Sequence, residues 1–82
     1  MTTRLSLESS VMTAMGKVLG LPVGRVTLND DFIRLGGNSL QAAQLASALQ
    51  GAYQALKITA QDVLRCQTAS VLADFIRRQG IG

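Results

Sequence analysis

The sequence predicts an all-α fold: a four-helix bundle with three long helices, a short third helix and a long loop between the first two. Apolar residues recur three and four positions apart over most of the chain, and no stretch alternates with the period of two that is typical of strands. With 82 residues, 48% of them apolar and 16% charged, the chain is long enough for one modest core. We therefore expect a single domain over residues 1–82.

The first helix is predicted over residues 7–19. Ser6 is a suitable N-cap, and Gly20 followed by Pro22 is a stop signal. One face of this helix is apolar and is expected to be buried: Val11, Met15, Val18 and Leu19.

The next segment, residues 21–38, is predicted to be a long loop. It is rich in turn formers, namely Pro22, Gly24, Asn29, Asp30, Asp31, Gly36 and Gly37. Long ordered loops in compact domains need apolar tethers. The residues expected to pin this loop onto the core are Val26, Leu28, Phe32, Ile33 and Leu35.

Three more helices are predicted after the loop. Residues 39–53 are rich in Ala, Leu and Gln and contain no proline, which favours a helix. Thr59 can cap a short third helix that runs through Arg65, and Thr68 can cap a fourth that runs through Gln79, where Gly80 ends it. The residues expected to be buried are Ala42, Leu45, Ala46, Leu49 and Tyr53, then Val63 and Leu64, and finally Val71, Leu72, Phe75 and Ile76.

The composition argues against several classes of function. The sequence has no histidine and one cysteine, Cys66, so we expect no zinc site, no intrachain disulfide and no Ser-His-Asp hydrolase. The net charge is +3, but the cations are scattered along the chain, so we expect no nucleic-acid binding. No apolar stretch suits a membrane span or a secretory signal, so we expect a cytoplasmic protein with no membrane partner. A monomer is the default expectation for a domain of this size.

The most informative segment is the junction at residues 31–40, where a loop turns through Gly36 and Gly37 into a helix. If Asn38 is the N-cap, Ser39 lies in the first turn with its hydroxyl free. An anion esterified there is stabilised by about 0.3–1 kcal/mol at the positive end of the helix. The alternative is that Ser39 is itself the N-cap and the glycines form only a turn. Local chemistry alone favours this alternative, because serine is common at helix starts.

Residues 30–40, with the sequence DDFIRLGGNSL, resemble the signature around the attachment serine of phosphopantetheine-dependent carrier proteins. The resemblance is closest to the peptidyl carrier, or thiolation, domains of non-ribosomal peptide synthetases, whose pattern is roughly D-x-F-F-x-L-G-G-x-S followed by L or I. It extends from about Ser6 to Gln79 and includes the length and the order of the helices.

The resemblance implies that a phosphopantetheinyl transferase, with CoA and magnesium, attaches 4′-phosphopantetheine covalently to Ser39, with Gly36, Gly37 and Asn38 as the supporting turn and cap. The thiol of this arm carries an aminoacyl, peptidyl or acyl group as a thioester. An adenylating or other loading enzyme supplies the cargo, and a condensation, thioesterase or tailoring enzyme receives it. The chain is then not an enzyme, and Cys66, for which an apolar structural role is expected, is not the carrying thiol.

Departures from the family pattern bear on the partners. Fatty-acid carriers typically have Asp at the position of Asn38 and peptidyl carriers often have His or Asp, so this residue does not identify the partner. Proline often stands at the position of Gln67, and the departure there concerns only the turn before the fourth helix. The first turns after Ser39 contain no acid, so docking is expected to rest on apolar contact rather than on acidic steering.

Helical spacing puts Leu40, Ala43 and Ser47 on the face that carries Ser39. We expect a docking patch formed by Leu40 and Ala43 with the loop residues Phe32, Ile33 and Arg34. An equal alternative is that Leu40 packs under the loop.

Other functions stay open at this point. Within the carrier class the cargo could be polyketide, aryl or fatty-acyl, and a different class is an unmodified helical module that binds protein. A hydrolase built on Ser39 would need Lys17 or Lys57 as a buried base, for which the sequence gives no sign. The sequence also leaves open whether the chain is a free-standing protein or a domain cut from a larger synthetase.

Overall fold

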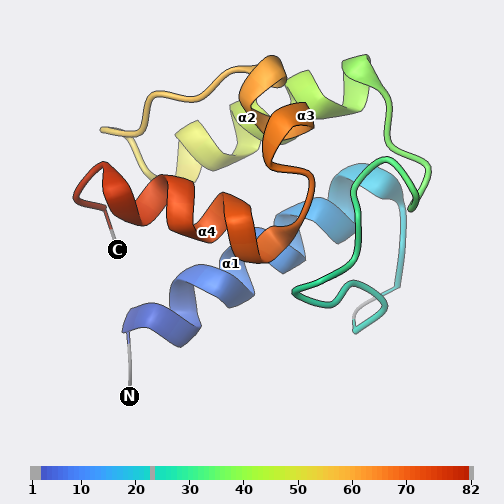
Figure 1. The fold of residues 1–82 in the computed structure, drawn as a ribbon, viewed down its shortest axis with the longest axis horizontal. Helices are drawn as coiled ribbons and strands as arrows, with labels where there is room; N and C mark the ends of the chain where they lie inside the picture. The colour runs from blue at the N-terminus through green and yellow to red at the C-terminus, as the bar shows by residue number, and fades with distance from the viewer. Residues whose placement is uncertain (1–2, 23, 82) are drawn as a thin grey trace.

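The structure is a computed structural model that describes residues 3–22 and 24–81, with the side chains of residues 3–6 excepted. Over this range the chain forms four helices: α1 (Thr3–Leu19), α2 (Ser39–Ala52), α3 (Ala60–Cys66) and α4 (Ala69–Arg78) (Figure 1). The described residues contain no strand, only an isolated antiparallel bridge between Asp31 and Thr68. The predicted all-α fold, with a short third helix, is confirmed.

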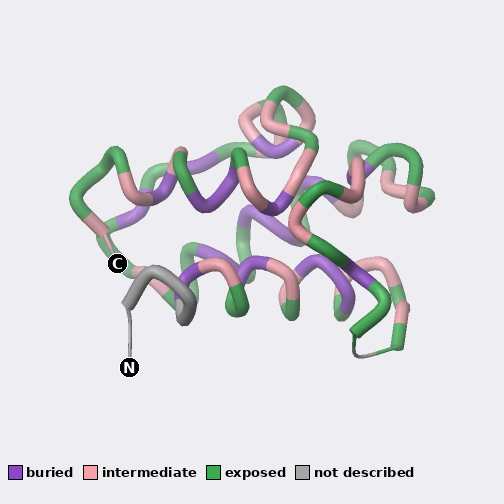
Figure 2. Tube along the Cα trace, turned by 60° about the horizontal axis from the view of Figure 1, so that its bottom comes forward, coloured by how far each residue is buried: buried purple, intermediate pink, exposed green. Residues whose placement is uncertain are grey.

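The helices enclose one apolar core. α1 contacts α2 and α4, while α3 packs against α2 and α4, and the loop between α1 and α2 crosses one end of the bundle (Figure 1). Buried positions recur along the inward side of the chain (Figure 2), and none of the buried residues in the described part is polar or charged. No helix in that part is long and apolar enough to cross a membrane. The largest fully buried side chains are Leu7, Val11, Met15, Phe32, Leu45, Leu49, Val63, Leu72 and Ile76.

The first helix begins earlier than the sequence predicted. Its bounds are Thr3–Leu19, so Ser6 lies inside the helix and the expectation that it is the N-cap is wrong. No Pro or Gly precedes Leu7 to stop the helix, and Leu7 is itself in the core, which favours a helical turn on its N-terminal side. The C-terminal end is as predicted. Gly20 has φ +71°, and Leu21 N–H donates to the Gly16 carbonyl at 2.9 Å, which is a Schellman motif.

The second helix has two unlike faces. Its inward face consists of Ala42, Leu45, Ala46 and Leu49, all buried as predicted. The alanines let neighbouring helices approach closely, while the outward face carries Gln, Ser and Ala. The helix contains no charged residue, and Tyr53 is its half-buried C-cap.

The caps of α3 and α4 are as predicted, but the predicted burial holds only in part, since Leu64 and Phe75 are half-buried. The Thr59 and Thr68 side chains accept hydrogen bonds from the N–H groups of Asp62 and Val71. Val71 itself is 47% exposed, so the expectation that it is buried is wrong. The reason is helical phase: the inward stripe of α4 is Ala69, Leu72, Ala73 and Ile76, which turns position 71 toward solvent.

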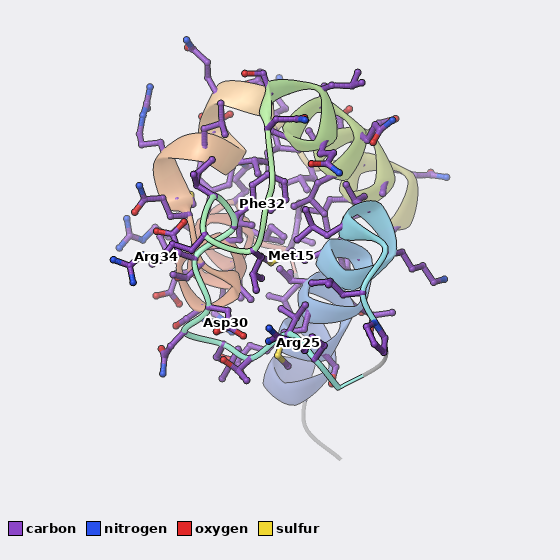
Figure 3. The ribbon with its side chains drawn as sticks, turned by 90° about the vertical axis from the view of Figure 1, so that its right-hand side faces the viewer. Met15, Arg25, Asp30, Phe32 and Arg34 are labelled. Atoms are coloured by element: carbon purple, nitrogen blue, oxygen red, sulfur yellow. The ribbon has the colours of Figure 1, made fainter. Side chains whose placement is uncertain are left out.

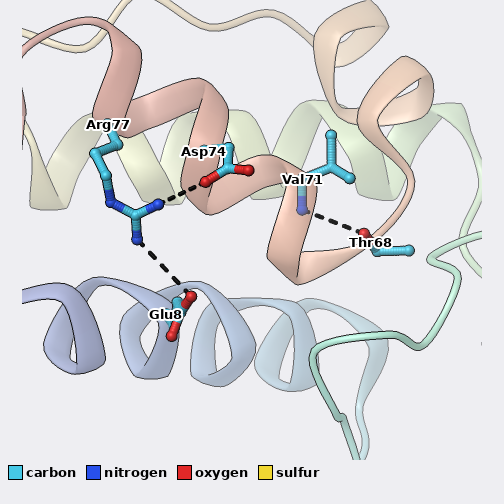
Figure 4. A network of polar contacts seen from close by, with 5 residues as sticks. All are labelled: Glu8, Thr68, Val71, Asp74 and Arg77. Atoms are coloured by element: carbon cyan, nitrogen blue, oxygen red, sulfur yellow. Dashed lines mark hydrogen bonds and ion pairs between the residues drawn. The ribbon is translucent and has the colours of Figure 1, made fainter.

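A polar contact joins α1 to α4 at the surface (Figure 4). Arg77 donates to the Asp74 carboxylate at 2.5 Å, and its second terminal nitrogen lies 3.8 Å from a carboxylate oxygen of Glu8. These side chains are partly solvated, and pairs of this kind typically contribute only about 0–1 kcal/mol. The bundle is therefore held mainly by its apolar core.

The two faces of α2 can be compared directly with two leucines. Replacing the fully buried Leu45 with Ala is expected to lower the free energy of unfolding by about 2–5 kcal/mol, because a cavity remains in the core. Leu40→Ala, at a side chain that is 67% exposed, is expected to change it by less than about 0.5 kcal/mol. Urea unfolding followed by circular dichroism measures both. Equal losses would show that Leu40 also packs into the fold.

Candidate functional site

The site begins with a single helical turn over residues 32–36, which Asp31 organises. The Asp31 side chain accepts from Ile33 N–H at 2.8 Å and more weakly from Arg34 N–H at 3.4 Å. Its own carbonyl accepts from Leu35 N–H at 2.9 Å. A short carboxylate at the start of a turn satisfies N–H groups that have no partner within the turn, so Asp31 acts here as a cap.

Phe32 ties this turn to the rest of the fold. Its side chain is 0% exposed. Its N–H donates to the Gln67 carbonyl at 2.6 Å and its carbonyl accepts from Gly37 N–H at 2.9 Å. In Figure 3 Phe32 reaches over the interior of the bundle, while Arg34, from the same turn, points away from it. The loop is therefore anchored by Phe32, whose side chain is buried and whose backbone N–H and carbonyl both form hydrogen bonds.

The two glycines serve different purposes. Gly36 has φ +102°, a conformation that residues with a Cβ rarely adopt. Gly37 instead provides space, since a Cβ built there would lie 2.5 Å from Cδ2 of the Phe32 ring and 2.7 Å from the Phe32 carbonyl oxygen. Only a residue without a side chain lets the backbone pass so close to this ring.

Asn38, and not Ser39, caps α2. Its side-chain oxygen accepts from Gln41 N–H at 2.9 Å, and the Gln41 side chain accepts from Asn38 N–H at 3.2 Å, which completes a capping box. The interpretation of Asn38 as the N-cap is confirmed, and Ser39 becomes the first residue of the helix. Ser39 is exposed, so its hydroxyl faces solvent at the positive end of α2.

The charges around Ser39 suit an esterified phosphate. The first turn of α2 contains no acid, and the helix contains no charge along its length. The Asp31 carboxylate is already occupied by backbone N–H groups of its own turn. The first N–H groups of a helix have no intrahelical partner and attract anions. An exposed hydroxyl in this field fits a covalently attached phosphopantetheine.

The expected docking residues separate into two groups. Ile33, Arg34, Leu40 and Ala43 are exposed, with Ile33 at 46% and Leu40 at 67%. Phe32 is buried in the core, so the expectation that its side chain contributes to a docking patch is wrong. Ile33, in turn, is not an anchor of the loop, because the turn organised by Asp31 directs it outward. The exposure of Leu40 also contradicts the alternative in which it packs under the loop.

Cys66 lies at the end of α3 and packs, half-buried, against the core. Burial, and to a smaller extent the nearby Asp62 carboxylate, raises the pKa of its thiol. The thiol is therefore protonated at neutral pH and is a poor nucleophile, which agrees with the apolar structural role expected for it.

One feature of the site was missed at the level of the sequence. Gln67 has φ +72° and ψ −43°, and Thr68 N–H donates to the Cys66 carbonyl at 2.8 Å, so residues 66–68 form a tight γ-turn. A residue with a side chain costs about 1–3 kcal/mol in such a conformation. The only available signal was that Gln67 departs from the proline common in carriers, and this did not predict the turn's shape.

Comparison with known proteins identifies the family. A sequence profile described as the phosphopantetheine attachment site matches residues 9–76, which include the whole junction and α2. The chain belongs to this phosphopantetheine-attachment family. The resemblance noted from residues 30–40 is therefore confirmed, and the chain is a carrier that tethers an intermediate on covalently attached 4′-phosphopantetheine.

Similar proteins include large synthetases. The carrier is 40% identical over 67 residues to nonribosomal peptide synthetase atnA of Emericella nidulans, an alignment that covers 82% of this chain and 1% of that protein. It is 39% identical over 74 residues to nonribosomal peptide synthetase ftmPS of Neosartorya fischeri, covering 90% of this chain and 3% of the relative. The carrier thus spans only a small fraction of the length of these relatives.

A solved structure has the same fold. The crystal structure of holo T3CT superimposes with a TM-score of 0.72 at 25% sequence identity, over 89% of this chain and 93% of that one. The four-helix arrangement of the carrier is therefore shared along nearly its whole length.

The space at Gly37 can be tested with a matched pair of glycines. Gly37→Ala is expected to lower the free energy of unfolding by about 1–3 kcal/mol, because the new methyl group forces the Phe32 ring or the loop to move. Gly51→Ala, in α2 where an added Cβ meets nothing within 4 Å, is expected to raise it by about 0.5–1 kcal/mol. Thermal unfolding measures both. A neutral Gly37→Ala would mean that the glycine is not needed for the close approach.

Proposed function

We propose that Ser39 is the attachment residue of this carrier and that the chain, residues 1–82, is one carrier unit without catalytic activity of its own. The observation that carries the proposal is the exposed Ser39 hydroxyl at the first position of α2, directly behind the capping box of Asn38. The match of residues 9–76 to the attachment-site family supports the same junction.

Modification of Ser39 is the work of another enzyme. The Ser39 oxygen loses its proton and forms a new P–O bond to the phosphate of the pantetheine arm, while the pyrophosphate bond of CoA breaks and adenosine 3′,5′-bisphosphate leaves. The proton acceptor comes from the phosphopantetheinyl transferase, because the sequence has no histidine and the first turn of α2 has no acid. Lys17 and Lys57 are both exposed, which argues against the buried lysine base that a hydrolase would require.

The cargo is proposed to be an aminoacyl or peptidyl group, held as a thioester on the arm. Support comes from the relatives, several of which are named nonribosomal peptide synthetases. On this proposal the loading partner is an adenylating enzyme, and a condensation or thioesterase enzyme receives the cargo. We propose that the carrier is modified and loaded in the cytoplasm, where CoA is available.

Partner enzymes are proposed to dock on a patch formed by Ile33, Arg34, Leu40 and Ala43. These residues are exposed and flank Ser39 in the chain. Because α2 contains no charge, apolar contact rather than acidic steering brings the partner to this patch. Arg34, whose side chain points outward (Figure 3), adds a positive charge at its edge.

Intact mass spectrometry tests the attachment residue. Incubation with CoA, magnesium and a broad-specificity phosphopantetheinyl transferase is expected to add one phosphopantetheine to the wild-type chain and none to Ser39→Ala. Ser47→Ala, which removes another exposed serine of α2, is expected to be modified normally. A folded wild-type chain that gains no mass would support the alternative of an unmodified protein-binding module.

Docking is tested by placing a charge on the apolar patch. Leu40→Glu is expected to raise KM for the carrier by about tenfold in the loading reaction, because a carboxylate disfavours burial against an apolar partner surface. Ala48→Glu is the matched control, as it places the same charge on an exposed position of α2 two turns further on. Circular dichroism should show both variants folded. A loss of helicity confined to Leu40→Glu would indicate a packing role instead.

A further inference from the structure

The turn that joins α3 to α4 is unusual in its backbone. Gln67 has the only positive φ of any residue other than glycine within the described ranges. Three hydrogen bonds hold the turn in this conformation. Gln67 N–H donates to the Val63 carbonyl at 3.0 Å, and Thr68 N–H donates to the Cys66 carbonyl at 2.8 Å. The Gln67 carbonyl in turn accepts from Phe32 N–H at 2.6 Å. Strained conformations persist where the surroundings determine them this strongly, and they often occur near functional sites.

The strained turn is connected to Ser39 through a short series of contacts. The Gln67 carbonyl holds the backbone of Phe32, and the antiparallel bridge between Asp31 and Thr68 lies directly beside this bond. The Phe32 carbonyl and ring then contact Gly37. Gly37 precedes the Asn38 cap, which sets where α2 begins. The links from Gln67 to Gly37 are backbone hydrogen bonds and close packing against the Phe32 ring, and Gly37 and Asn38 are consecutive residues.

The side chain of Gln67 takes no part in this connection. It is exposed, and the hydrogen bonds described for residue 67 involve its backbone N–H and carbonyl alone. Residue 67 therefore acts through its conformation, at a distance of 28 positions in the chain from Ser39.

We propose that the backbone of Gln67 is a positioning element of the carrier site: by holding Phe32, it fixes the start of α2 and the direction of the Ser39 hydroxyl. This inference rests on the proposed attachment at Ser39. Transfer of the phosphopantetheine group requires the hydroxyl to be aligned with the phosphate of CoA in the transferase, and small misplacements of a reacting group are costly. Loss of the Gln67–Phe32 bond should therefore slow the transfer step. Docking should be little changed, because the Asp31 carboxylate still holds Ile33 and Arg34 of the docking patch.

The test removes the bond without changing a side chain. Replacing Phe32 by its α-hydroxy acid analogue turns one amide into an ester and deletes the N–H that donates to Gln67. The matched control is the same replacement at Leu56, another buried loop residue, whose N–H donates to the Tyr53 carbonyl at 2.9 Å. Gln67→Ala is the second control and removes only the exposed side chain.

The expected result in the transferase reaction is a lower kcat with a nearly unchanged KM for the carrier. For the Phe32 ester, kcat falls about tenfold or more while KM for the carrier stays within about threefold. The Leu56 ester and Gln67→Ala keep kcat within about twofold of the wild type. An unchanged kcat in a folded Phe32 ester, or an equal loss in the Leu56 ester, would overturn the proposal.

Hydrogen exchange provides a second reading in the unaltered chain, should the Phe32 ester fail to fold. The amides of Phe32 and Gly37 are expected to be protected and to open together, since each belongs to the same series of contacts. A Phe32 amide that exchanges at the unprotected rate would refute the role of Gln67. Failure of the wild-type chain to accept phosphopantetheine refutes the proposed function instead, so the two failures are distinguishable.

Discussion

The packing of Phe32 against Gly37 is the constraint on which the site depends. An aromatic ring from the loop is fully buried in the core, and the chain then returns over it with no room for a side chain. The carbonyl of the same residue accepts the Gly37 N–H, so ring and backbone define one position for the residues that follow. Ser39 is two residues beyond this contact, and its place in space is therefore determined by the core rather than by the loop alone.

Charged groups near the site are used mainly to stabilise the backbone. Asp31 caps the turn before the glycines, Asp30 accepts from Thr27 N–H, and Asp62 completes the cap of α3. These carboxylates satisfy N–H groups that would otherwise lack partners. None of them lies in the first turn of α2, which contains no acid. The exposed Ser39 therefore lies at the positive end of α2, beside the exposed apolar residues Leu40 and Ala43. This arrangement favours a phosphodiester and partners that bind through apolar contact.

A domain of this size has a small free energy of unfolding. Its rigid contacts are concentrated where function requires them. The inward face of α2 is held by leucine and alanine in the core, whereas its outward face is exposed to solvent. The ion pairs of Arg77, one with Glu8 of α1 and one with Asp74 within α4, lie on helices that do not carry Ser39 and contribute little. The strained turn at Gln67 serves the same purpose, because the Gln67 carbonyl accepts the N–H of Phe32, which anchors the loop.

Much of this protein can be predicted from the sequence by itself, because periodicity, caps and turn residues are local. The four helices, the caps at Thr59 and Thr68 and the carrier signature around Ser39 are of this kind. The cap of α2 is not, because local chemistry alone favoured Ser39 whereas the structure has Asn38 as the cap. Tertiary structure alone decided which apolar side chains of the loop face inward: Phe32 enters the core, and Ile33, its neighbour, does not. It also decided that Val71 is exposed and that Gln67 adopts a positive φ. Burial and strain depend on which segments meet in space. Contacts between residues far apart in the chain, such as Phe32 and Gln67, leave no periodic pattern in the sequence.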